Sequence, residues 1–424
     1  MSESSELMPR WTIPLIYILV SLVGGAVILR LETTYFPYEH AMSVASGQAF
    51  LSAVSSGMIA LTGIVFAVSF VLIQFSAAAY SPRLTMLLAS DPRLFHALGI
   101  FIATFLYSLQ ALTWTDRGGS GGVPVISAWI VIALLVLSMV VFARTIQFVS
   151  DLQIGSVLQT IGTRGRAVIR TMFHPLDPKT ESAATQTAAA VRDLPASHQR
   201  VAYHGPPRAI AALDTTALVA LAERADATIV LDVAVGDTVV TNTTLLHVHG
   251  GTEIERDSLL RAVGLASSRT FEQDPKYAIR ILVDIAIRAL SPAVNDPTTA
   301  VQALDQIEDL LLRLGGSAFD VGRVHDASGA LRLVFPIPTW DDYLALAFDE
   351  IRQFGGSSVQ VMRRMKAALV NLRESLSVER RRVAVIAYLG HLDLEIERSE
   401  FDDADRAAAR KEDRQGLGLS RGTS

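Results

Sequence analysis

Cysteine is absent from the 424-residue chain. This absence excludes a disulfide framework and any metal site built on thiolate ligands. Charge is also scarce, because Asp, Glu, Lys and Arg make up 19% of the residues, against about 25% in average soluble domains. The formal net charge of −5 leaves no basic surplus that would neutralise the phosphates of a nucleic acid. No nucleic-acid partner is therefore expected.

Motifs of the common enzyme classes are also lacking. The sequence holds no Walker loop, no dinucleotide fingerprint, no nucleophile elbow and no HExxH pair, each of which fixes a reactive group or a phosphate in place. The only catalytic candidates lie around Asp284 and Asp296, and helix capping and charge pairing also account for these two residues. We therefore expect no enzyme and no cofactor, and we assign no catalytic residue.

The shortage of charge is concentrated in the N-terminal third of the chain. Between Trp11 and Phe142 ionisable side chains are few and grouped in short clusters, whereas the rest of the chain has an ordinary composition. This distribution is typical of a membrane part followed by a water-soluble part. The first partner expected for the chain is therefore a lipid bilayer.

Four apolar stretches have the length of about 20 residues that crosses the hydrocarbon core of a bilayer. They cover residues 11–29, 51–80, 95–114 and 123–143. The first stretch is too long for a cleavable signal peptide, and no small-residue cleavage site follows it. The sequence therefore predicts four transmembrane helices.

The arginines beside these stretches predict their direction. If the spans alternate, two arginines, Arg30 and Arg117, fall on one side of the membrane. Seven fall on the other: Arg10, Arg83, Arg93, Arg144, Arg164, Arg166 and Arg170. Because positively charged residues stay in the cytoplasm, both termini are predicted to be cytoplasmic, and the loops that contain "ETTYFPYEH" and "DRGGSGG" are predicted to face outward.

Ionisable side chains are absent from the interior of all four stretches, with His96 at an edge. Proton relays, voltage sensors and ion-coupled carriers usually need a charged group within the membrane. These three mechanisms are therefore disfavoured.

The second stretch carries a row of small or polar residues at helical spacing. The row consists of Ser52, Ser56, Ala60, Gly63 and Ala67, with Gln74 at its cytoplasmic end. Small residues at intervals of three or four allow helices to pack closely, either inside one bundle or between copies in a homo-oligomer. The alternative is that this face lines a pore.

We expect an α-helical membrane domain followed by an α+β cytoplasmic domain that contains a small β-rich module and a helical region. The expected parts are a cytoplasmic N-terminus (1–10), the transmembrane domain (11–143), a juxtamembrane helix and linker (144–199), the β-rich module (200–252), an α-helical or α+β domain (253–400) and a charged tail (401–424). The tail is expected to be a frayed helix or disordered.

The β-rich module contains the segment "VAVGDTVVTNTTLLHV", which looks like the hairpin of barrel-sandwich modules of the lipoyl and biotinyl kind. The resemblance rests on Gly236, Asp237 and Leu245. No lysine lies at the hairpin tip, so a swinging-arm cofactor is not expected. His247 and His249 lie on one face of the last strand, but no third ligand is apparent nearby. No metal site is therefore predicted.

The helix that begins after Asp274 is apolar almost all round and is therefore expected to be buried. Asp274 and the proline after it are typical of a capped helix start. Along this helix Arg280, Asp284 and Arg288 are spaced by four and share one stripe. Buried charges must be paired or must bind a charged ligand. One carboxylate between two guanidinium groups leaves a positive surplus.

The polar segment "ALSPAVNDPTTA", residues 289–300, separates this helix from the next one. Pro292 is expected to end the first helix, and Asp296 followed by Pro297 is expected to cap and start the second. The apolar core positions of the second helix recur at helical spacing: Val301, Leu304, Ile307, Leu311 and Leu314. Local structure does not explain Asn295. We expect Arg280, Asp284, Arg288, Asn295 and Asp296 to form either a structural charge network or a site for an anionic small molecule.

Two segments of the soluble half carry a resemblance to a known family. The segments "RTFEQDPKYAIRILVDIAIRALSPAVNDPTTA" and "PTWDDYLALAFDEIRQFG", preceded by four spans, resemble a bacterial family of predicted membrane proteins, domain of unknown function 2254. Membership implies a four-span protein of the bacterial inner membrane with a large cytoplasmic portion. It implies no reaction, substrate or catalytic residue.

Two functions remain open. The first is an oligomeric channel-like or transport-related protein whose cytoplasmic domain is regulatory, favoured by the uncharged spans and the long second helix. The second is a membrane-anchored scaffold or ligand sensor without a pore.

Overall fold

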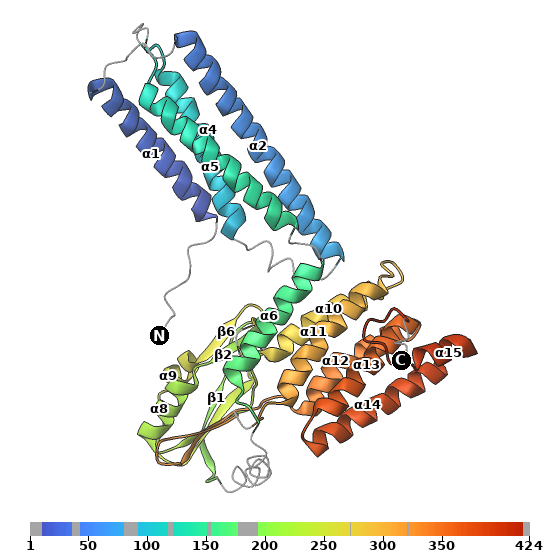
Figure 1. The fold of residues 1–424 in the computed structure, drawn as a ribbon. Coiled ribbons are helices and arrows are strands. Elements are labelled where there is room, and N and C mark those ends of the chain that lie inside the picture. Colours follow the sequence, from blue (N-terminus) through green and yellow to red (C-terminus); the bar gives the residue numbers. More distant parts are fainter. Residues whose placement is uncertain are drawn as a thin grey trace. The chain divides into compact units, whose positions relative to one another are not determined.

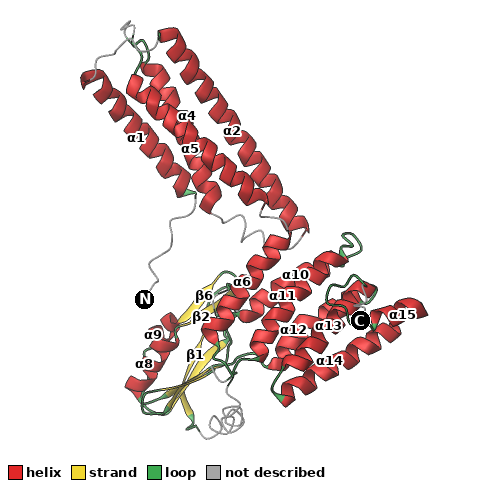
Figure 2. Cartoon of the chain, in the orientation of Figure 1, coloured by secondary structure: helices red, strands yellow, loops and turns green. Residues whose placement is uncertain are grey.

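The computed structural model describes residues 11–35, 43–79, 92–117, 122–150, 154–176, 194–271, 273–319 and 322–418. Contacts within the chain divide it into two units, Met1–Gln153 and Ile154–Ser424. Among the described residues the first unit contains helices only, whereas the second combines helices with strands (Figure 2). Each unit is described by itself below.

The first unit is a bundle of four long helices (Figure 1). They are α1 (Thr12–Tyr35), α2 (Val44–Ala79), α4 (Pro92–Trp114) and α5 (Val125–Ser150). Each is long and apolar enough to cross a membrane, as the sequence predicts. Helix α4 makes the most extensive contacts with the other three helices, so it forms the centre of the bundle.

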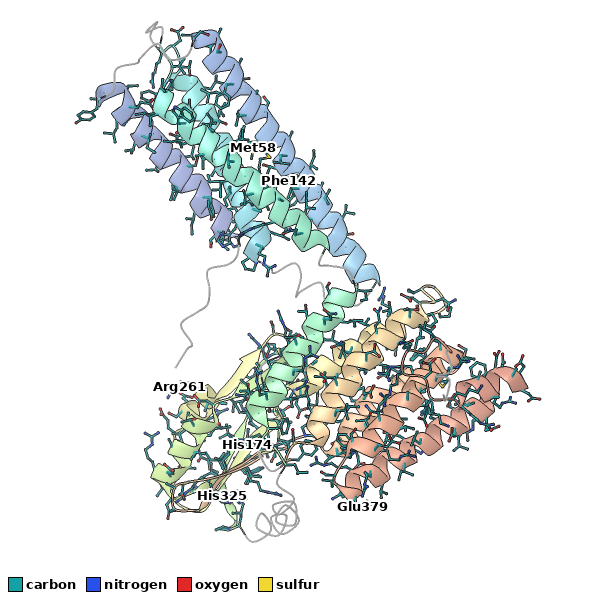
Figure 3. The ribbon with its side chains drawn as sticks, in the orientation of Figure 1. Met58, Phe142, His174, Arg261, His325 and Glu379 are labelled. Atoms are coloured by element: carbon teal, nitrogen blue, oxygen red, sulfur yellow. The ribbon has the colours of Figure 1, made fainter. Side chains whose placement is uncertain are left out.

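Glycines and hydroxyl groups bring these helices close together. A Cβ on Gly99 of α4 would lie 2.4 Å from the ring of Tyr17 on α1, so only glycine fits there. The Ser21 hydroxyl donates to the Ala103 carbonyl at 2.9 Å. Apolar side chains, among them Met58 of α2 and Phe142 of α5 (Figure 3), fill the space between the helices. Such close contacts stabilise helix pairs in lipid, where water gives no hydrophobic driving force.

Glu32 differs from the sequence-based expectation. The sequence places it in an outer loop, but helix α1 continues to Tyr35 and buries Glu32 to 4% exposure. Its Oε1 accepts from the Ile126 backbone N–H at 2.7 Å, and its Oε2 accepts from the Ser127 N–H at 3.1 Å and hydroxyl at 2.6 Å. These donors belong to the first turn of α5, where backbone N–H groups lack helical partners and the helix dipole is positive. The carboxylate can therefore be buried.

The second unit contains two sheets. The five-stranded sheet has the order β1 (Ser197–Ala202), β5 (Thr244–His249), β3 (Thr228–Leu231), β8 (Leu331–Val334), β7 (Arg323–His325). Its strands are antiparallel except for the β3–β8 pair. The three-stranded sheet has the order β4 (Thr238–Val239), β2 (Arg208–Leu213), β6 (Val263–Ala266). Helix α8 (Thr215–Ala225) packs on β3 and β8, and α9 (Arg256–Ala262) packs on α8 and β6.

The barrel-sandwich prediction is not confirmed. Asp237 does form the predicted turn, because its Oδ2 accepts from the Ala234 N–H at 2.8 Å, and Gly236 has a φ of +91°. The strands on either side of this turn do not pair with each other, however, because β3 pairs with β5 and β4 pairs with β2. The turn therefore leads the chain from one sheet to the other. Strands β6, β7 and β8, beyond residue 252, complete the sheets.

The rest of the second unit is helical. The helices are α6 (Ile154–Met172), α10 (Pro275–Ala289), α11 (Pro297–Gly315), α12 (Trp340–Gly355), α13 (Val359–Ser375), α14 (Glu379–Arg398) and α15 (Asp403–Ala409). Helix α11 contacts α6, α10, α12 and α13. Its predicted core positions are buried: Val301, Leu304, Ile307, Leu311 and Leu314. The sequence periodicity of this helix is therefore confirmed.

Arg381 of α14 closes the C-terminal end of α11. This side chain is buried, and its Nη1 donates to the carbonyl oxygens of Gly315 at 2.8 Å and Ser317 at 2.9 Å. The last carbonyls of a helix have no helical partner and carry the negative end of the dipole. The guanidinium satisfies both requirements. Trp340 of α12 donates to the Arg381 carbonyl at 3.2 Å, which also joins α12 to this point.

Part of the predicted tail is ordered helix. Asp402 caps α15 by accepting from the Asp405 N–H at 2.7 Å. Arg363 of α13 donates to the Ala408 carbonyl at 2.8 Å, and Ala409 is buried. Composition favours disorder here because apolar residues are few, but composition cannot show a helix that docks through its backbone. Residues 419–424 lie outside the described residues.

A substitution at Gly165 tests how closely α6 packs against α10 and α11. A Cβ on this residue would lie 2.9 Å from the Cβ of Ala278 and from a methyl group of Leu310. The variant Gly165→Leu is therefore expected to lower the free energy of unfolding by about 1–3 kcal/mol, the usual cost of overpacking. Gly155→Leu on the same helix is the matched control, because a Cβ there meets nothing within 4 Å. Thermal unfolding of the full chain in detergent measures both, and equal effects would contradict the described packing.

Candidate functional site

The two segments that carry the family resemblance form helices α10 and α12, which pack against each other. Polar side chains lie along their contact. We use "α10–α12 seam" for Asp274, Arg280, Asp284 and Arg288 of the α10 segment together with Tyr343 and Glu350 of α12. Helix α12 begins at a capping box in which Thr339 and Asp342 exchange hydrogen bonds, as expected for an acidic first turn.

The centre of the seam is a network of three charges. Arg280 donates from Nη1 and Nη2 to the two carboxylate oxygens of Glu350 at 2.5 and 2.7 Å, and from Nε to Asp284 at 2.7 Å. The bidentate bond to Glu350 raises the pKa of Arg280, although burial opposes this shift. The sequence predicts the Arg280–Asp284 pair but not Glu350, which lies on another helix. The centre of the seam is therefore a structural ion-pair network in which one guanidinium binds two carboxylates.

Arg288 is not part of this network. Its Nε is buried, and within the described part of the chain that atom has no hydrogen-bond partner. Arg288 also forms no ion pair with any described residue. The structure therefore does not bring Arg288 to Asp284 or to Asp296. A guanidinium with a free donor is suited to an anionic ligand such as a carboxylate or a phosphate.

Asn295 and Asp296 are explained by the backbone. Asn295 has a φ of +49°, a left-handed conformation that Asn tolerates better than most residues. Asp296 accepts from the Thr299 N–H at 3.1 Å and from the Thr299 hydroxyl at 2.6 Å. Its own N–H donates to the Ala289 carbonyl at 2.8 Å. Both residues shape the tight connection between α10 and α11, and neither contacts the charge network.

Asp274 does not cap α10 with its side chain, in contrast to the sequence-based prediction. Its Oδ2 accepts from Arg269 Nε at 3.0 Å and Nη2 at 2.6 Å instead. Its Oδ1 and the Tyr343 hydroxyl are both buried, and neither has a hydrogen-bond partner among the described atoms. A Cβ on Gly236 would lie 2.4 Å from the carboxylate. The inter-sheet turn therefore covers this end of the seam, where only glycine fits.

Burial changes the pKa values of the two titratable groups at this end of the seam, Asp274 and Tyr343. It raises the pKa of Asp274, a shift that the Arg269 guanidinium opposes. Burial, together with the negative charges of Asp274 and Asp342, raises the pKa of Tyr343 far above its ordinary range. The Tyr343 hydroxyl is therefore neutral and can donate one hydrogen bond, whereas the Asp274 carboxyl group binds a proton more readily than an exposed aspartate does.

A second charge network joins α11 to α13. Arg364, 4% exposed, donates to Asp305 at 2.7 Å and also to Glu308, which accepts from Asn371 at 2.5 Å. Burial raises the pKa of Asp305 against the opposing effect of Arg364. The spacing of Asp305 and Glu308 places them on one face of α11, a pattern in the sequence from which this network could have been predicted.

The two strand histidines have local partners. His247 Nε2 lies 3.3 Å from the Asp232 carboxylate, and His249 Nδ1 lies 2.8 Å from the Pro195 carbonyl. Over the described ranges, no three His, Cys, Asp or Glu side chains are grouped so that they could hold a metal ion.

The small-residue face of α2 lies outside the bundle. Ser52, Ser56, Ala60, Gly63, Ala67 and Gln74 are all exposed in the single chain. A Cβ on Gly63 would meet nothing within 4 Å. The buried side chains of α2, such as Leu51, Met58 and Val65, lie on the opposite side of the helix. This face therefore does not pack within its own bundle.

Substitution of the two arginines in the α10–α12 seam distinguishes a structural role from a ligand-binding role. Arg280→Ala leaves two carboxylates without their shared donor and is expected to lower the free energy of unfolding by about 2 kcal/mol. Arg288→Ala removes no side-chain hydrogen bond or ion pair with a described residue and is expected to change that energy by about 0.5 kcal/mol or less. Thermal unfolding of the two variants measures the difference. An equal loss in both would place Arg288 in the structural network.

The raised pKa of Asp274 predicts that the free energy of unfolding depends on pH. Because its pKa is raised above the ordinary value of about 3.9, the folded chain binds this proton more tightly than the unfolded chain. The resulting stabilisation is complete below the ordinary pKa and is lost as the pH rises through the raised pKa. Asp274→Asn is expected to remove this loss, measured as a flatter unfolding midpoint from about pH 4 to pH 7. The exposed Asp341→Asn should keep the original slope, and a similar change in both variants would contradict the assignment.

Comparisons with known proteins identify the family of the chain. Two mycobacterial proteins, "Uncharacterized protein Rv1290c" of Mycobacterium tuberculosis and "Uncharacterized protein Mb1321c" of Mycobacterium bovis, are each 27% identical to the chain over 412 residues. The similarity covers 94% of this chain and 78% of each relative. No solved structure matches. A family model described as "Predicted membrane protein (DUF2254)" matches residues 9–371. The chain therefore belongs to this family of predicted membrane proteins.

Proposed function

We propose that the protein is a homo-oligomeric, channel-like protein of the bacterial inner membrane, with both termini and the second unit in the cytoplasm. The observation that carries this proposal is the exposed small-residue face of α2. Its partner would be the same face of neighbouring copies, arranged around a common axis. The surplus of arginines beside one set of span ends supports the orientation.

The dimensions of α2 support a role beyond anchoring. The helix has 36 residues, which at 1.5 Å per residue is about 54 Å. The hydrocarbon core of a bilayer is about 30 Å thick. Helix α2 therefore reaches past the core, and its exposed Gln74 would lie near the cytoplasmic mouth of an axial path.

The chemistry of this face favours passive conduction. Hydroxyl groups of Ser52 and Ser56 and the bare backbone at Gly63 would line the path. Glu32, the buried carboxylate of α1, is occupied by the first turn of α5, so it does not supply a proton relay along α2. Polar groups without ionised side chains can line a pore that binds a passing ion weakly enough to release it.

A membrane-anchored anion sensor is the second candidate, and Arg288 is the observation that favours it. Its guanidinium, which forms no ion pair with any described residue, would bind an anionic group at the end of α10. In this case the four spans would serve only as anchor and oligomer contact. Regulation of a pore by such an anion would combine the two candidates.

Cysteine cross-linking tests the axial position of α2. Because the chain has no cysteine, each introduced thiol is the sole reporter. Gly63→Cys is expected to form a disulfide-linked dimer in oxidised membranes. Val68→Cys, which is exposed but faces away from the small-residue row, is the matched control and should stay monomeric. Equal cross-linking of the two variants would exclude an arrangement in which the small-residue faces of α2 meet around a common axis.

Ion flux into liposomes then tests the pore. Gly63→Leu fills the small-residue face and is expected to reduce flux at least tenfold relative to the unchanged chain. The Val68→Leu variant should leave flux unchanged. Absent flux, or flux that Gly63→Leu does not alter, would exclude a pore and leave the anchored sensor.

A further inference from the structure

Helix α14 presents a second uncovered face, in the second unit. One side of α14, including Val385 and Leu392, is buried against α12 and α13. The other side exposes Val383, Ile386 and Leu394 by 56%, 51% and 52%. A contiguous apolar row of this kind on a water-facing helix is typical of an interaction surface.

Small residues occupy the middle of this row. Ala387 and Gly390 are both exposed, and a Cβ on Gly390 would meet nothing within 4 Å. Flanked by the larger Val383 and Leu394, they form a shallow notch. A second helix could approach most closely at this notch.

Charges lie at both ends of the row. Glu379, labelled in Figure 3, and Arg380 lie at the N-terminal end, and Glu397 and Arg398 lie at the C-terminal end; all four are exposed. Glu379 pairs with Arg382 of its own helix, and Glu397 pairs with Arg410. Among the described residues, Arg380 and Arg398 have no ion-pair partner. Each end therefore offers a free guanidinium beside a surface carboxylate.

We propose that this face binds the same face of a second copy, with the two α14 helices antiparallel about a two-fold axis between Tyr388 and Leu389. In this register Val383 lies opposite Leu394 of the other copy, and Ala387 lies opposite Gly390. A two-fold contact requires a surface that is complementary to itself, and this row fulfils the requirement for both shape and apolar character.

Charge complementarity selects the antiparallel direction. In the same register Arg380 lies opposite Glu397 of the second copy, and Glu379 lies opposite Arg398. Both guanidinium groups that lack an ion pair thereby gain a carboxylate. A parallel pair would instead place Arg380 opposite Arg380 and Glu397 opposite Glu397, which like-charge repulsion disfavours. The contact does not depend on the α2 arrangement, because it lies in the other unit.

Paired cysteines in the full chain test this contact in native membranes. The double variant V383C/L394C is expected to form disulfide-linked dimers, since each thiol faces its counterpart on the second copy. Each single variant should yield less than a tenth of this amount of disulfide-linked dimer. In the antiparallel register, the same residue in the two copies is offset by 11 residues, about 16 Å along the helix. That offset exceeds the reach of a disulfide. Val240→Cys, 48% exposed and far from α14 in the sequence, gives the background yield.

Charge reversal in the double-cysteine chain provides a second measurement. Arg380→Glu is expected to lower the dimer yield several-fold, and Glu397→Arg added to it should restore the yield. Cross-linking of single variants, a double-cysteine yield at the Val240→Cys background, or failure of the restoring substitution would each overturn the proposal. Introducing Gly63→Leu should leave the yield unchanged, so failure of the α2 arrangement is distinguishable from failure of this one.

Discussion

Arg381 makes the interaction on which the helical half of the second unit depends. Helix α11 lies between α6, α10, α12 and α13, so its C-terminal carbonyls end where protein, not water, surrounds them. A buried carbonyl without a donor would cost about 1–3 kcal/mol. The Arg381 guanidinium supplies that donor to Gly315 and Ser317 and lies over the ring of Phe319. A residue 66 positions away in the chain thus completes the central helix.

Local patterns in the sequence predicted the start of α11 and its core. Asp296 caps the helix, as an Asp before a proline often does, and the buried periodicity of α11 follows from helical geometry. The same patterns failed at Asp274, whose carboxylate binds Arg269. They also missed Glu350, which meets Arg280 across two helices. Both failures concern tertiary partners, which the spacing of residues within one helix cannot show.

The two sheets illustrate the same limit. Each strand segment near Gly236 has the alternation of a strand, and the turn has the expected residues. The pairing of β4 with β2 rather than with β3 depends on segments before and after the turn. In the first unit, the length of the apolar stretches predicted all four candidate spans. The direction in which the small-residue face of α2 points could not be predicted in the same way, because it depends on which side of α2 packs against α4. Burial of the opposite side of α2 decides that direction.

The carboxylate of Glu32 has a consequence for biogenesis. Its partners are the first backbone N–H groups of α5, the last of the four spans to be synthesised. Until that span is present, the Glu32 carboxylate at the end of α1 lacks its hydrogen-bond donors, and a carboxylate without donors opposes burial of this turn in lipid. A chain truncated after α4 would therefore leave the Glu32 carboxylate without these hydrogen bonds.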